Sequence, residues 1–219
     1  MNFIFVGFCV NILQFMEIKY LGWQSFRLQE GKTSLITQPY SQKETGVLFP
    51  KVKADIVLQI FPGKKAGDRI TPSGRKEVFW LFGPGEYEIG GVDIRGIPGA
   101  YWFRMRQFEI VFLWQWDLKG IKKLADSLPT IDLLLIKGKG EENGFAKKIK
   151  SAVEAISPSI TIPFCSPTVK KEDLKENKWA KSFLDALDRE DVKAKEKLVL
   201  DKEEIAGEDL KVFLLQPRL

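Results

Sequence analysis

The sequence predicts an α/β fold in which β-sheets pack against each other and helices lie outside them. In the first half of the chain, apolar and polar residues alternate with a period of two, which is typical of strands. From about residue 119, helical spacing alternates with short apolar runs. Strands first, then strands and helices in turn, favour packed sheets with helices on the outside.

Size and composition are those of a globular domain. A chain of 219 residues buries roughly 70% of its unfolded surface, so it needs neither a disulfide nor a metal to be stable. Hydrophobic residues make up 44% of the chain and charged residues 29%, which excludes disorder. The net charge of +5 indicates a solvated exterior more than a nucleic-acid partner. Cys9 and Cys165 suggest no disulfide framework, so we expect the protein to be located in the reducing cytoplasm.

Residues 1–15 form an apolar stretch ahead of the first clear strand. The stretch lacks a basic flank and a convincing cleavage site for a signal peptide, and it is too short to span a bilayer. We expect an N-terminal extension, such as a wrongly assigned start, rather than a membrane anchor. Residues 16–219 then form a single domain, and no membrane partner is predicted.

Each element of the first half is predicted from its local pattern. Alternation over 17–37 predicts an antiparallel meander, and a loop with Gly46 and Pro50 follows. The nearly continuous apolar run 55–60 is typical of a strand covered on both faces. Further strands are expected at 77–82 and 92–96, on either side of tight turns in GPGEYEIGG, and a hairpin is expected at 100–113.

The second half alternates helices and strands. Helical spacing begins at about 119 and recurs over 145–156, with a buried strand at 131–136 between the two helices. A short strand is expected at 159–162, an amphipathic helix at 174–187 and a closing strand at 210–215.

Several segments resemble a known family in their order and spacing: MEIKYLGWQSFRLQ, ADIVL, GPGEYEIGGVDIRGIP, IDLLLIKGKG and SPSITIPF. They resemble the metallo-beta-lactamase superfamily, and within it a small bacterial branch of zinc-dependent hydrolases similar to ascorbate-6-phosphate lactonases. The resemblance covers about residues 16–217. It implies a four-layer αβ/βα sandwich with two mixed sheets face to face, helices on the outer faces and a metal site at one edge.

The zinc ligands that this resemblance implies are almost all missing. The family motif H-x-H-x-D-H falls on residues 61–66, so that Phe61, Gly63, Lys65 and Ala66 stand at its ligand positions. The family's G-H-S becomes Gly22-Trp23-Gln24, its aspartate-proline becomes Gln38-Pro39, and its I-P-x-H ends in Cys165. Tyr101 or Trp102 stands where a further histidine is usual, and the aspartate of the G-D-L stretch alone survives, as Asp117.

A catalytic zinc site needs about three imidazole, thiolate or carboxylate ligands and an open position for water. The chain contains no histidine. We therefore expect no zinc, no other cofactor and no catalytic residues, and we interpret the chain as a degenerate member kept as a binding or interaction protein. Its partner is not indicated, and a homo-oligomer is compatible with the sequence. The alternatives are a metal-dependent hydrolase, by family likeness, and a nucleic-acid-binding module.

Large apolar residues stand at or beside the vacated positions: Trp23, Phe61, Trp102, Trp116 and Phe164. Burial of each aromatic side chain contributes roughly 1.5–3 kcal/mol, whereas uncompensated imidazoles and carboxylates are costly to bury. We hypothesise that an aromatic cluster fills the former site. The alternative is that these residues are ordinary aromatics that face a sheet.

Two residues could still carry chemistry. Asp117 could act with Lys64 or Lys65 in an open polar pocket, as a non-metal enzyme would require. If the chain is instead a degenerate member without activity, we expect this pocket to be filled and Asp117 to be solvated or paired with a lysine such as Lys119. Cys165 has no histidine to act as its base, so a buried, inert thiol is predicted.

Two further motifs have a structural and a functional interpretation. Gly138-Lys139-Gly140 faintly resembles a phosphate-binding loop but lacks the P-loop spacing, so a turn is favoured. Residues 101–108 interleave aromatics with arginines, as nucleic-acid platforms do, yet a hairpin with alternating faces gives the same pattern.

Overall fold

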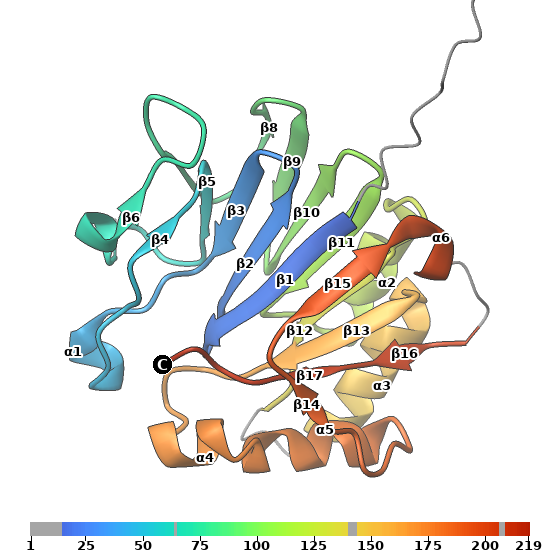
Figure 1. Ribbon diagram of the computed structural model, residues 1–219. Coiled ribbons are helices and arrows are strands. Elements are labelled where there is room, and N and C mark those ends of the chain that lie inside the picture. The colour runs from blue at the N-terminus through green and yellow to red at the C-terminus, as the bar shows by residue number, and fades with distance from the viewer. Residues whose placement is uncertain (1–14, 64, 140–143, 206–208) are drawn as a thin grey trace, which may run out of the picture.

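Two large β-sheets face each other in the computed structural model, which describes residues 15–63, 65–139, 144–205 and 209–219 (Figure 1). Residues 1–14 of the predicted N-terminal extension therefore lie outside the described residues, as do Lys64 and Gly140. Phe15, the last residue of that extension, is the first residue of a strand.

The first sheet has six strands in the order β15-β1-β2-β3-β5-β7. Its antiparallel part, predicted as a meander, is β1 (Phe15–Gly22), β2 (Ser25–Glu30) and β3 (Thr33–Thr37). β5 (Ile56–Gln59) and β7 (Phe79–Phe82) continue it in parallel with β3, and β15 (Leu198–Asp201) pairs with β1 at the other border.

The second sheet has seven strands in the order β16-β13-β12-β11-β10-β9-β8. Four of them form an antiparallel group: β8 (Gly85–Glu88), β9 (Val92–Ile97), β10 (Ala100–Met105) and β11 (Phe108–Leu113). The others run parallel to β11: β12 (Leu133–Lys137), β13 (Ile160–Phe164) and β16 (Lys211–Val212).

The main core lies between the two sheets. Ile18 and Leu28 point into it from the first sheet, and Phe103, Phe112 and Leu135 point into it from the second. These side chains alternate with residues that face away, which is how a period of two buries one face of each sheet.

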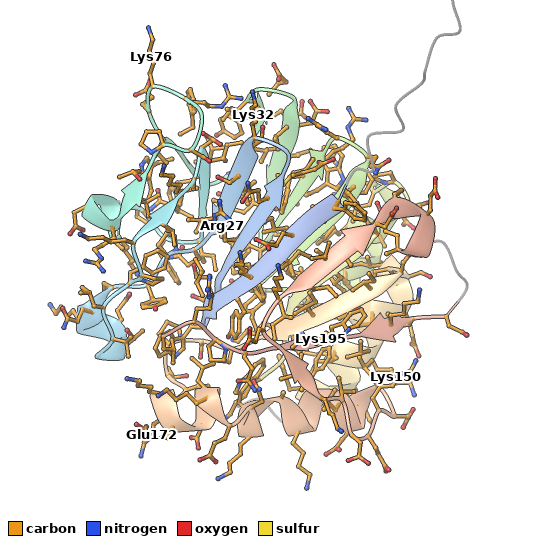
Figure 2. The ribbon with its side chains drawn as sticks, viewed as in Figure 1. Arg27, Lys32, Lys76, Lys150, Glu172 and Lys195 are labelled. Carbon is orange, nitrogen blue, oxygen red and sulfur yellow. The ribbon has the colours of Figure 1, made fainter. Side chains whose placement is uncertain are left out.

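Helices cover the sandwich unequally. α2 (Leu118–Asp126), α3 (Phe145–Ile156) and α5 (Lys181–Ala186) lie on the outer side of the second sheet, where they close a second apolar cluster (Figure 1). On the outer face of the first sheet, Glu17, Lys19 and Arg27 alternate with core residues, and Figure 2 shows Arg27 there. The two-sheet sandwich predicted from the sequence is confirmed, but in the described residues no helix covers this polar face.

Short elements complete the chain: α1 (Gln42–Thr45), β4 (Val52–Lys53), η1 (Gly67–Arg69), β6 (Ile70–Thr71), α4 (Lys171–Lys175), η2 (Lys178–Ala180), β14 (Ala194–Lys195), α6 (Lys202–Ile205) and β17 (Leu214–Leu215). β4 pairs with β6, and β14 pairs with β17.

Three sequence predictions need correction. The helix expected at 174–187 is interrupted, because Asn177 adopts a left-handed conformation (φ 55°) between α4 and η2. The closing strand at 210–215 is divided between β16 and β17, which pair with different strands. The predicted loop 41–53 contains α1 and β4, and β15 is a strand that was not predicted.

In the part of the chain that the structure describes, no helix has the length and the apolar character that crossing a bilayer demands.

Candidate functional site

One edge of the sandwich brings together the ends of strands from both sheets. The Tyr101 hydroxyl, from β10, donates a hydrogen bond to the Gln59 carbonyl oxygen at the end of β5, over 2.9 Å. The Tyr20 hydroxyl, from β1, donates to the Trp23 carbonyl oxygen over 2.7 Å and lies 3.8 Å from Cys165 Sγ, just past β13. Positions that are far apart in the sequence therefore meet here.

Trp23 is locked into the turn between β1 and β2. Its backbone is left-handed (φ 50°), yet only 1% of the residue is exposed. The indole N–H donates to the Val169 carbonyl oxygen over 2.9 Å, and the ring lies edge-on to Tyr40 with centroids 4.6 Å apart. Tyr40 meets Phe49 in the same way at 4.8 Å. A buried indole whose N–H has a partner is a stable packing element.

Cys165 is a buried, free thiol, as predicted. Burial raises its pKa to about 12, so it is protonated at neutral pH. A thiol in that state is a poor nucleophile and a poor metal ligand, because both roles need the thiolate.

A chain of aromatic rings runs from Cys165 into the core between the sheets. Neighbouring ring centroids lie 4.7–6.2 Å apart, and the rings follow one another in the order Tyr20, Phe26, Phe164, Phe112, Trp114 and Tyr101. Such offset and edge-to-face contacts each contribute about 0.5–1.5 kcal/mol beyond the burial of area.

Of the five residues in the hypothesised aromatic cluster, Trp23 and Phe164 are buried in the main core, and the other three are not. Trp102 and Trp116 pack in the apolar cluster on the outer side of the second sheet. The indole N–H of Trp102 donates to Glu109 there over 2.9 Å. Phe61 is 53% exposed, so its ring does not fill the interior of this edge.

Alternation along the strands explains which aromatic residues face the main core. Tyr101 and Trp102 are neighbours on β10, so their side chains point to opposite faces, and Tyr101 is the one that faces inward. After β11 the inward aromatic is Trp114 rather than Trp116. Tyr40 and Phe49 come from a segment with no periodic pattern, so nothing in the sequence marked them.

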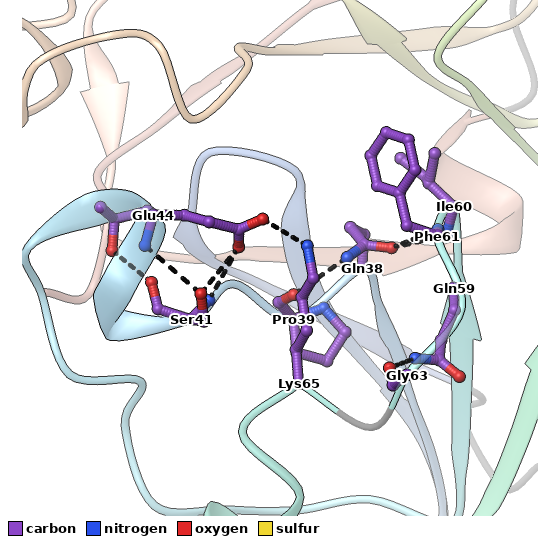
Figure 3. Close-up of polar contacts among 10 residues, drawn as sticks. Gln38, Pro39, Ser41, Glu44, Gln59, Ile60, Phe61, Gly63 and Lys65 are labelled. Carbon is purple, nitrogen blue, oxygen red and sulfur yellow. Dashed lines mark hydrogen bonds and ion pairs between the residues drawn. The ribbon is translucent and has the colours of Figure 1, made fainter.

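The loop that follows β5 is held by side-chain amides (Figure 3). Gln38 Oε1 accepts hydrogen bonds from the backbone N–H groups of Ile60 and, over 3.3 Å, Phe61. Gln38 Nε2 donates to the Pro39 carbonyl oxygen over 3.0 Å, and Gln59 Nε2 donates to that of Gly63. The loop is therefore fixed by neutral hydrogen bonds.

The far part of this loop is joined to α1. Lys65 forms an ion pair with Glu44, and its ammonium lies 5.3 Å from the centre of the Phe61 ring (Figure 3). Glu44 also forms a capping box with Ser41. A cavity of about 20 Å³ remains between Trp23, Phe61 and Lys65, which is room for about one water molecule. Ala66, the last motif position, adopts a left-handed conformation (φ 55°) before η1.

Asp117 has a structural role at a different place. It is the N-cap of α2, where Oδ1 accepts from Lys119 N over 2.9 Å and from Gly120 N over 2.7 Å. The N–H of Gly120, and then that of Lys119, holds the pKa of this exposed carboxyl below its usual value.

The space beside Asp117 is open, so the prediction of a filled pocket is wrong. A cleft of about 550 Å³ lies between Asp117, Trp116 and the apolar face of α2. Lys65 does not line it, and Lys64 lies outside the described residues. The structure therefore does not bring Asp117 and Lys65 into one cavity, as the non-metal enzyme would require.

The hairpin at 101–108 is a two-faced element of the sheet. Tyr101, Phe103 and Met105 are buried in the main core, and Arg104 pairs with Asp93. Its inward aromatics are thus unavailable for stacking on bases. Gly138 directly follows β12, and its N–H donates to the Phe164 carbonyl oxygen over 2.7 Å, which continues the pairing of β12 with β13.

Comparison with protein-family models matches residues 17–165 to the beta-lactamase superfamily domain. The chain belongs to the beta-lactamase superfamily. Comparison with curated proteins gives no match.

Solved structures support the fold of this superfamily member. One, described as a zinc-dependent hydrolase of the metallo-beta-lactamase superfamily from Thermotoga maritima, shares 19% identity over 91% of this chain and 98% of its own, with a TM-score of 0.60. Igni18, a metallo hydrolase from Ignicoccus hospitalis, shares 10% identity over 85% and 99%, with a TM-score of 0.58. The metallo-beta-lactamase fold protein YhfI from Bacillus subtilis shares 12% identity over 85% and 99%, with a TM-score of 0.55. At these identities the likeness shows the fold alone.

The residues that this superfamily member offers at the edge do not fit zinc. Phe61, Gly63, Lys65 and Ala66 provide no imidazole, thiolate or carboxylate. Cys165 is a protonated thiol, and Asp117 lies on the outer side of the second sheet. Among the described residues, no group of three or more His, Cys, Asp or Glu lies close enough to hold a metal ion.

Proposed function

We propose that this chain is a member of the beta-lactamase superfamily without zinc-dependent hydrolysis, and that it acts by binding a ligand or a partner. The observation that carries this proposal is the donor set at the edge where the family resemblance implies a metal. A chain without histidine offers one buried thiol there, and the neighbouring positions carry aromatic and amide side chains.

The packing at this edge supports the same proposal. In a catalytic zinc site, the ligands must be deprotonated and the metal must keep one position open for water. Here the rings of Trp23 and Tyr40 pack edge to face, and Gln38 binds the backbone of the loop. Packing, neutral hydrogen bonds and the Lys65–Glu44 ion pair thus hold this edge together, and its small remaining cavity has no space for a substrate.

The location that we propose is a reducing compartment such as the cytoplasm. Cys165 is a free thiol in the core, and the charge balance of the chain is that of a solvated domain. The nucleic-acid alternative loses its support, since the aromatics of the 101–108 hairpin that face the core are buried.

An activity survey tests the proposal. The purified protein is assayed with a chromogenic β-lactam, a nitrophenyl phosphodiester and a lactone, each with added zinc and each with a chelator. The Thermotoga maritima protein is assayed under the same conditions for comparison. We expect no turnover above that of heat-denatured protein in any condition. Turnover that zinc raises and the chelator abolishes would show that the chain is a metal-dependent hydrolase after all.

A further inference from the structure

The cleft beside Asp117 is large enough for a small molecule. Its volume of about 550 Å³ falls within the range of ligand sites, which is roughly 300–1,000 Å³. It lies between the turn that joins β9 to β10, the segment after β11 and α2. A second hollow of about 360 Å³ adjoins it and shares Ile97, Pro98 and Ser127 with it.

The walls of this cleft are mainly apolar, with contributions from Ile97, Pro98, Leu113, Trp116, Ile121 and Leu124. Trp116 is a fixed wall. Its indole N–H donates to the Lys148 carbonyl oxygen over 3.3 Å, and its ring packs on Phe145 with centroids 5.8 Å apart. A preformed aromatic wall binds an apolar group at little cost in side-chain entropy.

The charged side chains that line the cleft are those of Asp117 and Lys123, and Gln115 and Ser127 line it as well. The two hydrogen bonds of Asp117 both go to its Oδ1 and come from the backbone of α2. Lys123 lines the cleft, is exposed, and has no ion pair among the described residues. Lys123 is therefore a cation that a ligand in this cleft can reach.

The surroundings of the cleft favour an anion. Helices α2 and α3 pack together and carry six lysines against two acidic residues: Lys119, Lys122, Lys123, Lys147, Lys148 and Lys150 against Asp126 and Glu154. Asp117 subtracts one charge, and Asp188, which pairs with Lys150, subtracts another. The two helices beside the apolar hollow therefore keep a net excess of positive charge. Such a field attracts anions and repels cations.

We propose that this cleft binds a small amphipathic anion, with its apolar body against Trp116 and Leu124 and its carboxylate or sulfonate on Lys123. The inference gives a site and a ligand class to the binding role proposed above. It does not depend on the loss of zinc, because the cleft and the edge described above lie on opposite sides of the second sheet.

A fluorescence titration with anilinonaphthalene sulfonate tests the inference, since this probe is an aromatic anion that brightens in apolar sites. We expect saturable binding of one probe per chain to the folded protein. Decanoate should displace the probe, whereas decylammonium should not. Lys123→Glu should weaken binding about tenfold or more, and Trp116→Ala should weaken it similarly. Lys181→Glu, an exposed charge reversal on α5 away from the cleft, is the matched control and should leave binding unchanged.

Three results would overturn the inference: no saturable binding, equal binding to Lys123→Glu and wild type, or stronger displacement by decylammonium than by decanoate. The last would mean that Asp117 selects a cation. Circular dichroism and thermal melting of each variant show whether it is folded. If Trp116→Ala fails to fold, the binding measured with Lys123→Glu and with the two competitors still tests the inference. None of these results changes the outcome of the hydrolase assays, so the two proposals can fail separately.

Discussion

The Tyr101 hydroxyl on the second sheet donates a hydrogen bond to the Gln59 carbonyl oxygen on the first, over 2.9 Å. It also accepts one from the backbone N–H of Gly83 over 3.0 Å. The family resemblance places a histidine at Tyr101 or at its neighbour Trp102. One of these two residues thus joins the two sheets at this edge of the sandwich.

Tyr101→Phe should lower the free energy of unfolding by about 1–3 kcal/mol. The change removes this partner from the buried Gln59 carbonyl oxygen and from the half-buried Gly83 N–H. Urea denaturation measures the difference. Tyr87→Phe, on β8, removes a half-buried hydroxyl and is the control, with an expected change below about 0.5 kcal/mol. Equal stability of Tyr101→Phe and wild type would show that this link between the sheets contributes nothing.

Gln38→Ala should release the loop after β5. The side chain of Gln38 accepts from the N–H groups of Ile60 and Phe61, which then lose their protein acceptor. Hydrogen exchange at these two amides should become faster by one order of magnitude or more, which corresponds to about 1.4 kcal/mol or more. Gln29→Ala, which removes an exposed amide, should leave their exchange as in the wild type. Unchanged exchange in Gln38→Ala would mean that the loop is held by other contacts.

Glu30 should make stability depend on pH. This residue is 2% exposed, and neither of its carboxylate oxygens has a hydrogen-bond partner among the described residues. Burial raises its pKa to about 7, against the weaker opposing effect of Arg106. The folded state therefore holds a proton that the unfolded state releases above about pH 4.5. Stability falls as the pH rises from about 4.5 to about 7, by at most about 3 kcal/mol, and then levels off.

The variant Glu30→Gln isolates this effect. A neutral amide of the same shape has no proton to lose, so the fall in stability between the two pKa values should largely disappear. Urea denaturation at pH 5 and pH 8 gives the comparison. The same pH dependence in Glu30→Gln and wild type would assign the effect to another group.

Cys165 should be unreactive in the folded protein. Its thiol is buried, and its pKa is raised to about 12. In a Cys9→Ser background, a disulfide reagent should fail to label Cys165 at pH 8 until denaturant is added. Rapid labelling of the native protein would show that the edge opens readily to solvent.

Local patterns predicted the elements better than they predicted the site. Alternation over 17–37 identified β1, β2 and β3, and the apolar run at 55–60 identified β5. Short sequence windows carry this information because strands bury one residue in two, or all of them when both faces are covered.

The residues of the site could not be predicted from short sequence windows. Tyr101 and Trp102 are equally apolar in the sequence, and the strand register alone decides which one points inward. Phe61 follows the end of β5, where no period applies, and its ring lies on the surface. Tyr40 packs on Trp23 and Phe49 packs on Tyr40, although both come from a segment whose sequence predicts a loop.

Equilibrium zinc binding tests the central claim most directly. The metal-free protein competes for zinc with a chromophoric chelator at neutral pH, under reducing conditions, in wild type and in Cys165→Ser. We predict that neither protein withdraws zinc from the chelator, because the edge presents aromatic rings, amides and a protonated thiol. One zinc ion per wild-type chain, lost in Cys165→Ser, would contradict the account.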